Sequence, residues 1–118
     1  MKAIIAITTL MLVTIVSVAV ATSVDNEIEH LLDYVRQSDV VFIRNGTEHK
    51  ASAAAEHMQK KRQHFKDQIR TAEDFIRLTA TKSLLSNQPY LVRTRDGNTE
   101  ECSTWLQNEL NRFRKSKK

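Results

Sequence analysis

Glycine and proline are nearly absent from this chain, which has two glycines and one proline among its 118 residues. Both residue types end helices and form tight turns, so all-β folds with many turns need more of them. The same scarcity argues against collagen-like and low-complexity disordered chains. We therefore expect helices to dominate the fold, with few turns between them.

The first 21 residues differ in character from the rest of the chain. Lys2 is followed by an apolar stretch from Ala3 to Val20, and residues 1–21 contain no acidic side chain. The stretch ends in the small residues Ala19-Val20-Ala21, which is the pattern of a secretory signal peptide and its cleavage site. We predict cleavage after Ala21, which makes residues 1–21 a signal peptide and the protein periplasmic or secreted.

An uncleaved membrane anchor is the alternative interpretation of this segment. About 18 apolar residues at roughly 1.5 Å each would nearly cross a bilayer core of about 30 Å. Hydroxyl side chains within the stretch weaken this interpretation; they are Thr8, Thr9, Thr14 and Ser17. A lipid anchor at the cleavage site requires a cysteine there, and the only cysteine is Cys102. We therefore expect no stable membrane span after cleavage.

Residues 22–118 are expected to form a single small domain with a basic C-terminal tail. The formal charge of the full chain is +4, and the loss of Lys2 reduces it to +3. Small exported domains often depend on disulfides, but the single Cys102 cannot form an internal one. Packing must therefore hold the fold, and intermolecular pairing of Cys102 remains open.

Four segments have the apolar spacing of amphipathic helices. The first covers residues 25–37 and has acidic residues in its first turn, where the helix dipole favours them. The second runs from Thr47 to about Gln68 without a glycine or proline. The third begins at the capping-box sequence Thr71-Ala-Glu-Asp74, and the fourth begins at Ser103 as its cap.

Two short runs are typical of β-strands. Residues 40–43 are β-branched or aromatic and lead to the Asn45-Gly46 turn, whereas residues 90–94 follow Pro89 and lead to the Asp96-Gly97 turn. We expect the two strands to pair antiparallel. The predicted fold class is therefore α+β and helix-dominated, with about four helices packed on a minimal two- or three-stranded antiparallel sheet.

Several short sequence blocks, taken in order, resemble the YfeK-like family of small, uncharacterised bacterial periplasmic or secreted proteins. The blocks are Phe42-Ile43-Arg44-Asn45-Gly46, Ala55-Glu56-His57 with Lys61, Thr71-Ala72-Glu73-Asp74-Phe75-Ile76 and Pro89-Tyr90. Members typically have a small residue and a glycine before the Pro-Tyr pair, where this chain has Leu84-Leu85-Ser86-Asn87-Gln88, and often an aromatic residue at the position of His49. The family has no established activity, so the resemblance implies an exported bacterial domain of unknown function.

Four polar residues form the most suggestive candidate binding site, namely Arg44, His57, Lys61 and Tyr90. His57 and Lys61 share a helix face, and the other two lie on the predicted strands. If the four converge, they form a small cationic pocket suited to an anion or a glycan fragment. Structural hydrogen bonding between helix and sheet is the alternative role.

Other kinds of site find little support in the sequence. No two histidines have the i, i+3 or i+4 spacing of helical zinc ligands, and His49, Glu56 and His57 would be the least unfavourable metal set. Cys102 follows two glutamates, and adjacent negative charge raises the pKa of a thiol. Glu73 and its neighbour Asp74 point about 100° apart on a helix, so they do not form an acid and base pair.

The sequence therefore favours a non-enzymatic binding or interaction module of the cell envelope, with no cofactor and no catalytic residues. Its partner could be an envelope protein, a peptide or a glycan, and nucleic acid is excluded because the predicted compartment holds little of it. One alternative is a small envelope hydrolase that uses His57 with Glu73 or Tyr90. The other is a structural protein anchored by the uncleaved N-terminal segment. The oligomeric state is left open.

Overall fold

The computed structural model describes residues 23–117, so the predicted signal peptide and its cleavage site lie outside the described residues. The first described element is a helix over residues 23–37, which we call the N-terminal helix. Ile28, Leu31, Leu32 and Val35 are all buried along one face of it, as their spacing predicts. The helix ends at residue 37, where the sequence predicts its end, and it includes the whole predicted range of 25–37.

The sheet has four strands, all antiparallel, in the order β2-β1-β3-β4. They are β1 (Val41–Arg44), β2 (Thr47–His49), β3 (Leu91–Arg93) and β4 (Thr99–Glu101). The predicted pairing of the two apolar strands is confirmed, since β1 pairs with β3 in the centre of the sheet. The predicted count of two or three strands was one too low, because each edge strand is short and polar.

Strand β2 also corrects the predicted start of the second helix. Asn45 and Gly46 both have positive φ, 54° and 75°, which is the geometry of a tight hairpin turn with right-handed strand twist. The chain after this turn therefore returns alongside β1 as β2, where we had expected a helix from Thr47 onwards. Helix α2 (Ala51–His64) begins only after the strand.

The end of α2 differs from the prediction as well. The helix stops at His64 and is followed by a 3-10 turn, η1 (Lys66–Gln68), instead of continuing to Gln68. Its buried side chains are Ala54, Ala55 and Met58, so small residues allow close packing on this face.

Helix α3 (Ala72–Thr79) begins where the capping sequence predicts. The Thr71 hydroxyl accepts a hydrogen bond from the backbone N–H of Asp74 at 3.0 Å. The Asp74 carboxylate in turn accepts from the backbone N–H of Arg70 at 3.0 Å, one residue before the position of an ideal capping box. These two bonds satisfy backbone donors that the start of a helix leaves without partners.

Helix α4 (Cys102–Ser116) follows β4 without an intervening loop, so the N-cap is Glu101 and its side chain makes no capping bond. The predicted cap at Ser103 was therefore wrong, because Ser103 already lies inside the first turn. Leu106 and Leu110 are fully buried on the inner face of this helix.

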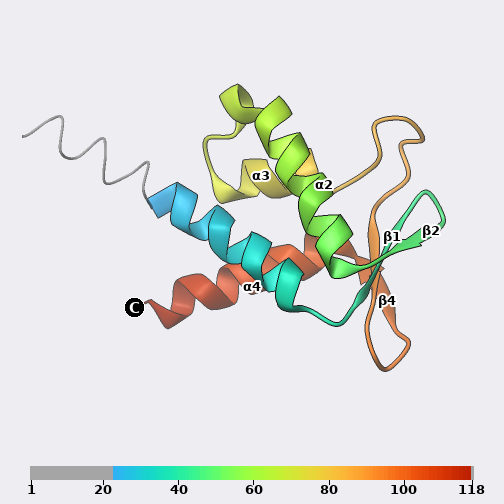
Figure 1. The fold of residues 1–118 in the computed structure, drawn as a ribbon. Coiled ribbons are helices and arrows are strands. Elements are labelled where there is room, and N and C mark those ends of the chain that lie inside the picture. The colour runs from blue at the N-terminus through green and yellow to red at the C-terminus, as the bar shows by residue number, and fades with distance from the viewer. Residues whose placement is uncertain (1–22, 118) are drawn as a thin grey trace, which may run out of the picture.

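The helices lie on one side of the sheet and surround a common core (Figure 1). In Figure 1 the N-terminal helix crosses α4, and α2 passes in front of α3. The largest fully buried side chains come from both the helices and the sheet; they include Phe75, Leu31, Leu32, Leu106, Leu110 and Val92. The predicted helix-dominated α+β class is thus confirmed. Within residues 23–117, no helix combines the length and apolarity needed to cross a bilayer.

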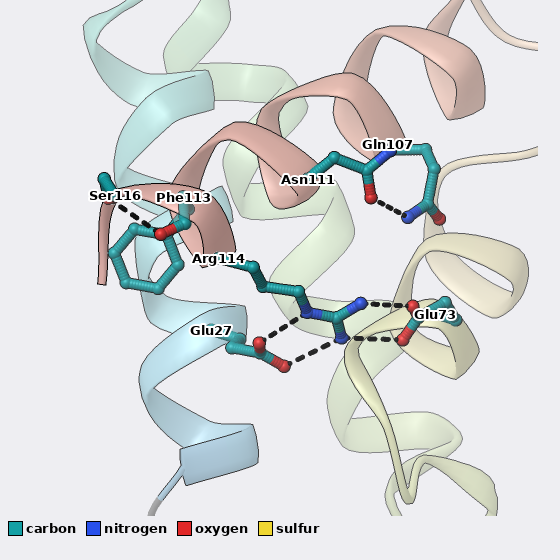
Figure 2. Close-up of polar contacts among 7 residues, drawn as sticks. All are labelled: Glu27, Glu73, Gln107, Asn111, Phe113, Arg114 and Ser116. Carbon is teal, nitrogen blue, oxygen red and sulfur yellow. Dashed lines mark hydrogen bonds and ion pairs between the residues drawn. The ribbon is translucent and has the colours of Figure 1, made fainter. Parts of the chain in front are cut away.

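Arg114 joins three helices near the C-terminus of α4 (Figure 2). Its guanidinium donates two hydrogen bonds to Glu27 of the N-terminal helix, at 2.7 and 3.1 Å. It donates two more to Glu73 of α3, at 2.6 and 2.9 Å. Both pairs are bidentate, the strongest geometry for an arginine and a carboxylate.

A second polar contact joins the N-terminal helix to α4 through Glu109, which is buried and only 4% exposed. Its carboxylate accepts from His30 at 2.5 Å and from two guanidinium nitrogens of Arg112 at 2.8 and 2.6 Å. The His30 ring also stacks on Phe113 with centroids 3.9 Å apart. Because the carboxylate accepts hydrogen bonds from both sides and pairs with the charged Arg112, its burial is tolerated.

Candidate functional site

The four residues of the predicted cationic site come together at one end of the sheet. Arg44 ends β1 and Tyr90 directly precedes β3. Because Ile43 pairs with Leu91, the next residues of these antiparallel strands lie opposite each other. Arg44 and Tyr90 also share the sheet face of the buried Phe42, since alternate residues point to one side. This is the face that α2 covers with His57.

The hydroxyl of Tyr90 is the centre of the site. It lies 3.2 Å from Nε2 of His57 and 3.3 Å from Nζ of Lys61. Lys61 can only donate, so the hydroxyl oxygen accepts from it and is free to donate its proton to the imidazole. His57 then accepts through Nε2 and carries its own proton on Nδ1. Lys61 also lies 5.1 Å from the centroid of the Tyr90 ring, within cation–π distance.

The surroundings keep His57 uncharged at neutral pH. Burial lowers the pKa of its imidazole to about 4, and the positive charge of Arg44 is the next largest cause. Burial also lowers the pKa of Lys61, and Arg44 contributes to this shift. The pKa of Tyr90 is raised by burial, so its hydroxyl stays protonated. At neutral pH the site thus presents two cations, a neutral imidazole and a phenol.

No carboxylate among residues 23–117 forms an ion pair with Arg44 or Lys61. Neighbouring cations on the same helix do have such partners: Lys60 pairs with Glu56, and Arg62 pairs with Glu29 and Asp25 of the N-terminal helix. The two cations of the site are therefore available for an external anion.

An open groove of about 410 Å³ lies over these groups. This volume is within the range of small-molecule sites, roughly 300 to 1,000 Å³. The four site residues line one side, and the loop between α3 and β3 lines the other through Ser83, Leu84 and Leu85. Asn45 of the β1–β2 turn closes the end and donates to the hydroxyl of Ser83 at 3.2 Å.

A smaller apolar cavity lies behind the site, between the sheet and α2. It is lined by side chains that include Phe42, Ala54, Met58 and Cys102, and its volume is about 30 Å³. That is enough space for only a few water molecules. The groove therefore does not continue into a tunnel that could hold a long apolar chain.

The structure separates the other residues considered from the sequence. Glu73 does not approach His57, because its carboxylate is bound to Arg114 on α4. The proposed pairing of His57 with Glu73 was therefore wrong. His49 and His57 line the small cavity together with Cys102, but no three metal-binding side chains in the described part of the chain lie close enough together to hold a metal ion.

Cys102 is a weak acid, but for a reason other than the one expected. Burial alone raises the pKa of its thiol to about 12, and the adjacent glutamates make no contribution. The residue is 1% exposed at the start of α4. A thiol in this position is shielded from other protein chains, which disfavours the intermolecular disulfide that the sequence left open.

The loop at residues 83–88 is the part of the site that the sequence analysis missed. Its hydrogen bonds to Asn45 depend on tertiary contacts that no spacing rule predicts. The available signal was the pair Leu84-Leu85, which is apolar within an otherwise polar stretch that precedes Pro89. Contiguous apolar patches that stay exposed to solvent commonly mark surfaces that contact another molecule.

Comparison with known proteins identifies relatives whose function is also undetermined. A model described as "Family of unknown function (DUF5329)" matches residues 22–114. The "Uncharacterized protein YfeK" of Salmonella typhimurium (strain LT2) is 34% identical over 55 residues, which cover 47% of this chain and 46% of that protein. The match thus spans about half the length of the curated relative. No solved structure matches the chain.

Proposed function

Since the chain belongs to the DUF5329 family of unknown function, its own site has to supply the argument, and we propose that it is an exported, non-enzymatic binding module. In this proposal Arg44, His57, Lys61 and Tyr90 hold an anionic group of the ligand. The observation that carries it is the pair of cations without carboxylate partners at the mouth of an open groove.

Each of the four residues has a distinct role in this proposal. Arg44 supplies a planar fork that can bind two oxygens of a carboxylate or phosphate, and Lys61 supplies a compact positive charge. Tyr90 fixes the position of Lys61 through its hydroxyl oxygen. His57 holds that hydroxyl from the other side while remaining neutral, so it adds no further repulsion between cations.

The cost of holding the cations together also supports a ligand-binding role. Arg44 lowers the pKa of Lys61, which means that the positive charges destabilise each other in the free protein. A bound anion relieves this repulsion. Sites with unfavourable electrostatics in the free state are commonly functional sites.

Binding is better supported than hydrolysis. Without Glu73, the hydrolase alternative retains only His57 and Tyr90. Ser83 also lines the groove, but its hydroxyl oxygen already accepts from Asn45 and from the backbone N–H groups of Leu85 and Ser86. A nucleophile needs a free lone pair and an adjacent base, and Ser83 contacts neither His57 nor any other base.

The export part of the proposal depends on the apolar segment at residues 3–20 and its small-residue end. The single, buried Cys102 is compatible with an oxidising compartment because it offers no thiol for unwanted pairing. The anchored alternative is tested by N-terminal sequencing of the protein recovered from cells. A start at Thr22 supports export and cleavage, whereas a retained N-terminus supports the anchor.

A titration with matched ligands tests the binding proposal. We would follow the backbone and ring NMR signals of the protein while adding inorganic phosphate, galacturonate or uncharged galactose. The proposal predicts saturable shifts at Tyr90 and His57 with both anions and none with galactose.

The double substitution Arg44→Gln with Lys61→Gln should weaken anion binding at least 10-fold. The control Lys115→Gln with Lys117→Gln removes the same charge from the end of α4, remote from the site, and should not change it. Equal affinities of the two double variants would refute the site. Partner classes can then be ranked by capture from envelope extract, where a peptide, glycan or protein that uses the site is lost only with the first variant.

A further inference from the structure

The loop that borders the groove exposes two leucines to solvent. Leu84 is 70% exposed and Leu85 is 97% exposed, and they are the only large apolar side chains exposed to this degree among residues 23–117. The other large apolar side chains of this range are buried or partly buried. Two adjacent leucines held in water are unfavourable unless another apolar phase covers them.

Hydrogen bonds fix the loop in this conformation. Ser83 is 4% exposed, and its backbone N–H bonds to the carbonyl of Gln88 while its carbonyl accepts from Asn87. The Ser83 hydroxyl accepts from the backbone of Leu85 and Ser86. The loop therefore presents its leucines from a defined base, and the leucines themselves are not needed for that base.

The charge around the leucines is positive. No acidic residue occurs in the sequence between Ala80 and Val92, and Lys82 is exposed at the foot of the loop. Arg44 and Lys61 line the same groove as both leucines. In Figure 1 this loop and the β1–β2 hairpin lie at one end of the molecule, whereas the C-terminal end of α4 lies at the other. One end of the domain thus combines protruding apolar side chains with unpaired cations.

We propose that this end of the protein docks on an anionic lipid bilayer, with Leu84 and Leu85 inserted at the headgroup boundary and Arg44 and Lys61 on lipid phosphates. The inference rests on the proposed function, because it identifies the bound anionic group as a phospholipid headgroup. A cationic rim beside protruding apolar residues is the arrangement by which peripheral proteins bind such surfaces.

A bilayer fits these features better than other occupants. A second copy of the chain would bring the same cations together, so like charges would oppose the contact. Extraction of a whole lipid would need a cavity for its chains, but the space behind the groove is about 30 Å³. A bilayer supplies both the apolar phase and the negative charge without any pocket in the partner.

Vesicle binding of paired variants tests the proposal. Protein produced from the full-length sequence would be mixed with vesicles of phosphatidylcholine alone or with phosphatidylglycerol added, and bound protein separated by flotation. Any N-terminal segment that is retained is identical in all variants. Differences in vesicle binding between the variants therefore report on the end of the protein that carries Leu84, Leu85, Arg44 and Lys61. The proposal predicts binding to the anionic vesicles that weakens with added salt.

The substitution Leu84→Ser with Leu85→Ser should lower partitioning onto anionic vesicles at least 10-fold, about 1.4 kcal/mol, while the circular dichroism spectrum stays unchanged. Arg44→Gln with Lys61→Gln should lower both vesicle and phosphate binding, and Lys115→Gln with Lys117→Gln should lower neither. Phosphate binding without vesicle binding would overturn the membrane inference and leave the proposed function standing. If the wild type binds neither phosphate nor anionic vesicles, the membrane inference and the proposed function are both overturned.

A reporter on the loop provides a second readout. Cys102 is 1% exposed, so a cysteine introduced as Leu85→Cys can be labelled selectively with an environment-sensitive fluorophore. Anionic vesicles should shift its emission to the blue, and lipid-bound nitroxides should quench it. The same label at Asn111→Cys, on the exposed side of α4, should stay in water. Equal responses at the two positions would contradict insertion of the loop.

Discussion

Replacing His57 by glutamine should remove a specific part of the acid sensitivity of this protein. The pKa of His57 is about 4 in the folded protein, against 6.5 for an ordinary histidine. Between these values the unfolded chain binds a proton that the folded chain does not, so stability falls as the pH falls from 6.5 towards 4. Glutamine keeps a hydrogen-bonding group for Tyr90 but does not titrate, so this loss disappears in the variant.

The magnitude follows from the size of the pKa difference and the exposure of the ring. At about 1.4 kcal/mol per pKa unit, a drop from 6.5 to 4 corresponds to roughly 3 kcal/mol for a fully buried group. His57 is only half-buried, so solvent screening reduces this to about 1 to 2 kcal/mol. About 1 kcal/mol of it should be lost between pH 6.5 and pH 5.

The charged and titratable groups that surround the imidazole come from three elements and the adjoining residue Tyr90. They are Arg44 of β1, His49 of β2, and Lys60 and Lys61 of α2. The cations among them all lower the pKa of His57, in the same direction as burial does. The pKa values of Glu73 and Glu109 are lowered by their arginine partners, so their contribution is lost only below about pH 4.5. The range from pH 6.5 to pH 5 therefore isolates His57 from these carboxylates.

The assay is urea denaturation at fixed ionic strength over a series of pH values, for the wild type, His57→Gln and the control His64→Gln. His64 lies at the exposed end of the same helix. The free energy of unfolding of His57→Gln should change about 1 kcal/mol less than that of the wild type between pH 6.5 and 5. An NMR titration gives the pKa of His57 directly. A measured pKa of 6 or higher, or identical pH profiles of wild type and His57→Gln, would refute the electrostatic description of the site.

Substitutions at Arg114, Glu109 and Lys61 test other contacts by urea denaturation. Arg114→Met should lower the free energy of unfolding by about 1 to 2 kcal/mol, because two carboxylates lose their partner. The control Arg36→Met breaks one exposed ion pair and should have a smaller effect. Equal effects of the two substitutions would contradict the role of Arg114. Glu109→Ala should lower the free energy of unfolding by about 2 kcal/mol, and Glu109→Met should lower it by less than about 1 kcal/mol, since methionine refills the space. A larger loss of stability in the methionine variant would show that the charge itself is required. Lys61→Gln should leave the free protein equally or more stable while it weakens anion binding, and a clear loss of stability would favour a purely structural role for the lysine.

Apolar spacing was sufficient to predict the elements that bury a continuous face. The N-terminal helix follows from Ile28, Leu31, Leu32 and Val35, and the central strand pair follows from β-branched runs between turn residues. The capping sequence at Thr71 fixed the start of α3 because the hydrogen bond is local. These features depend on residues close in sequence or on the periodicity of one element.

The edge strands could not be predicted in the same way. Thr47-Glu48-His49 and Thr99-Glu100-Glu101 are polar and three residues long, so neither has a measurable alternation. Their strand conformation comes from hydrogen bonding to β1 and β3, which is a tertiary effect. Ser103 looked like a helix cap because serine favours that position, but the helix begins directly at the end of β4.

The candidate site was predictable in part. Two of its residues lie one helical turn apart, and the other two lie next to strands whose pairing was expected, so their convergence follows from the predicted topology. The exclusion of Glu73 was not predictable, because it depends on the arrangement of α3 against α4 and on the reach of Arg114. The outward orientation of Leu84 and Leu85 depends on hydrogen bonds of Ser83 that sequence spacing does not encode.

The contacts between the N-terminal helix and α4 set an order on the maturation of the domain. Glu27 and His30 find their partners Arg114 and Glu109 in α4, 87 and 79 residues further along the chain. Until the ribosome has made that helix, the buried face of the N-terminal helix lacks one of its main neighbours. The packing of the domain can therefore be completed only after α4 has been synthesised, because contacts between residues far apart in sequence form only when both segments are present.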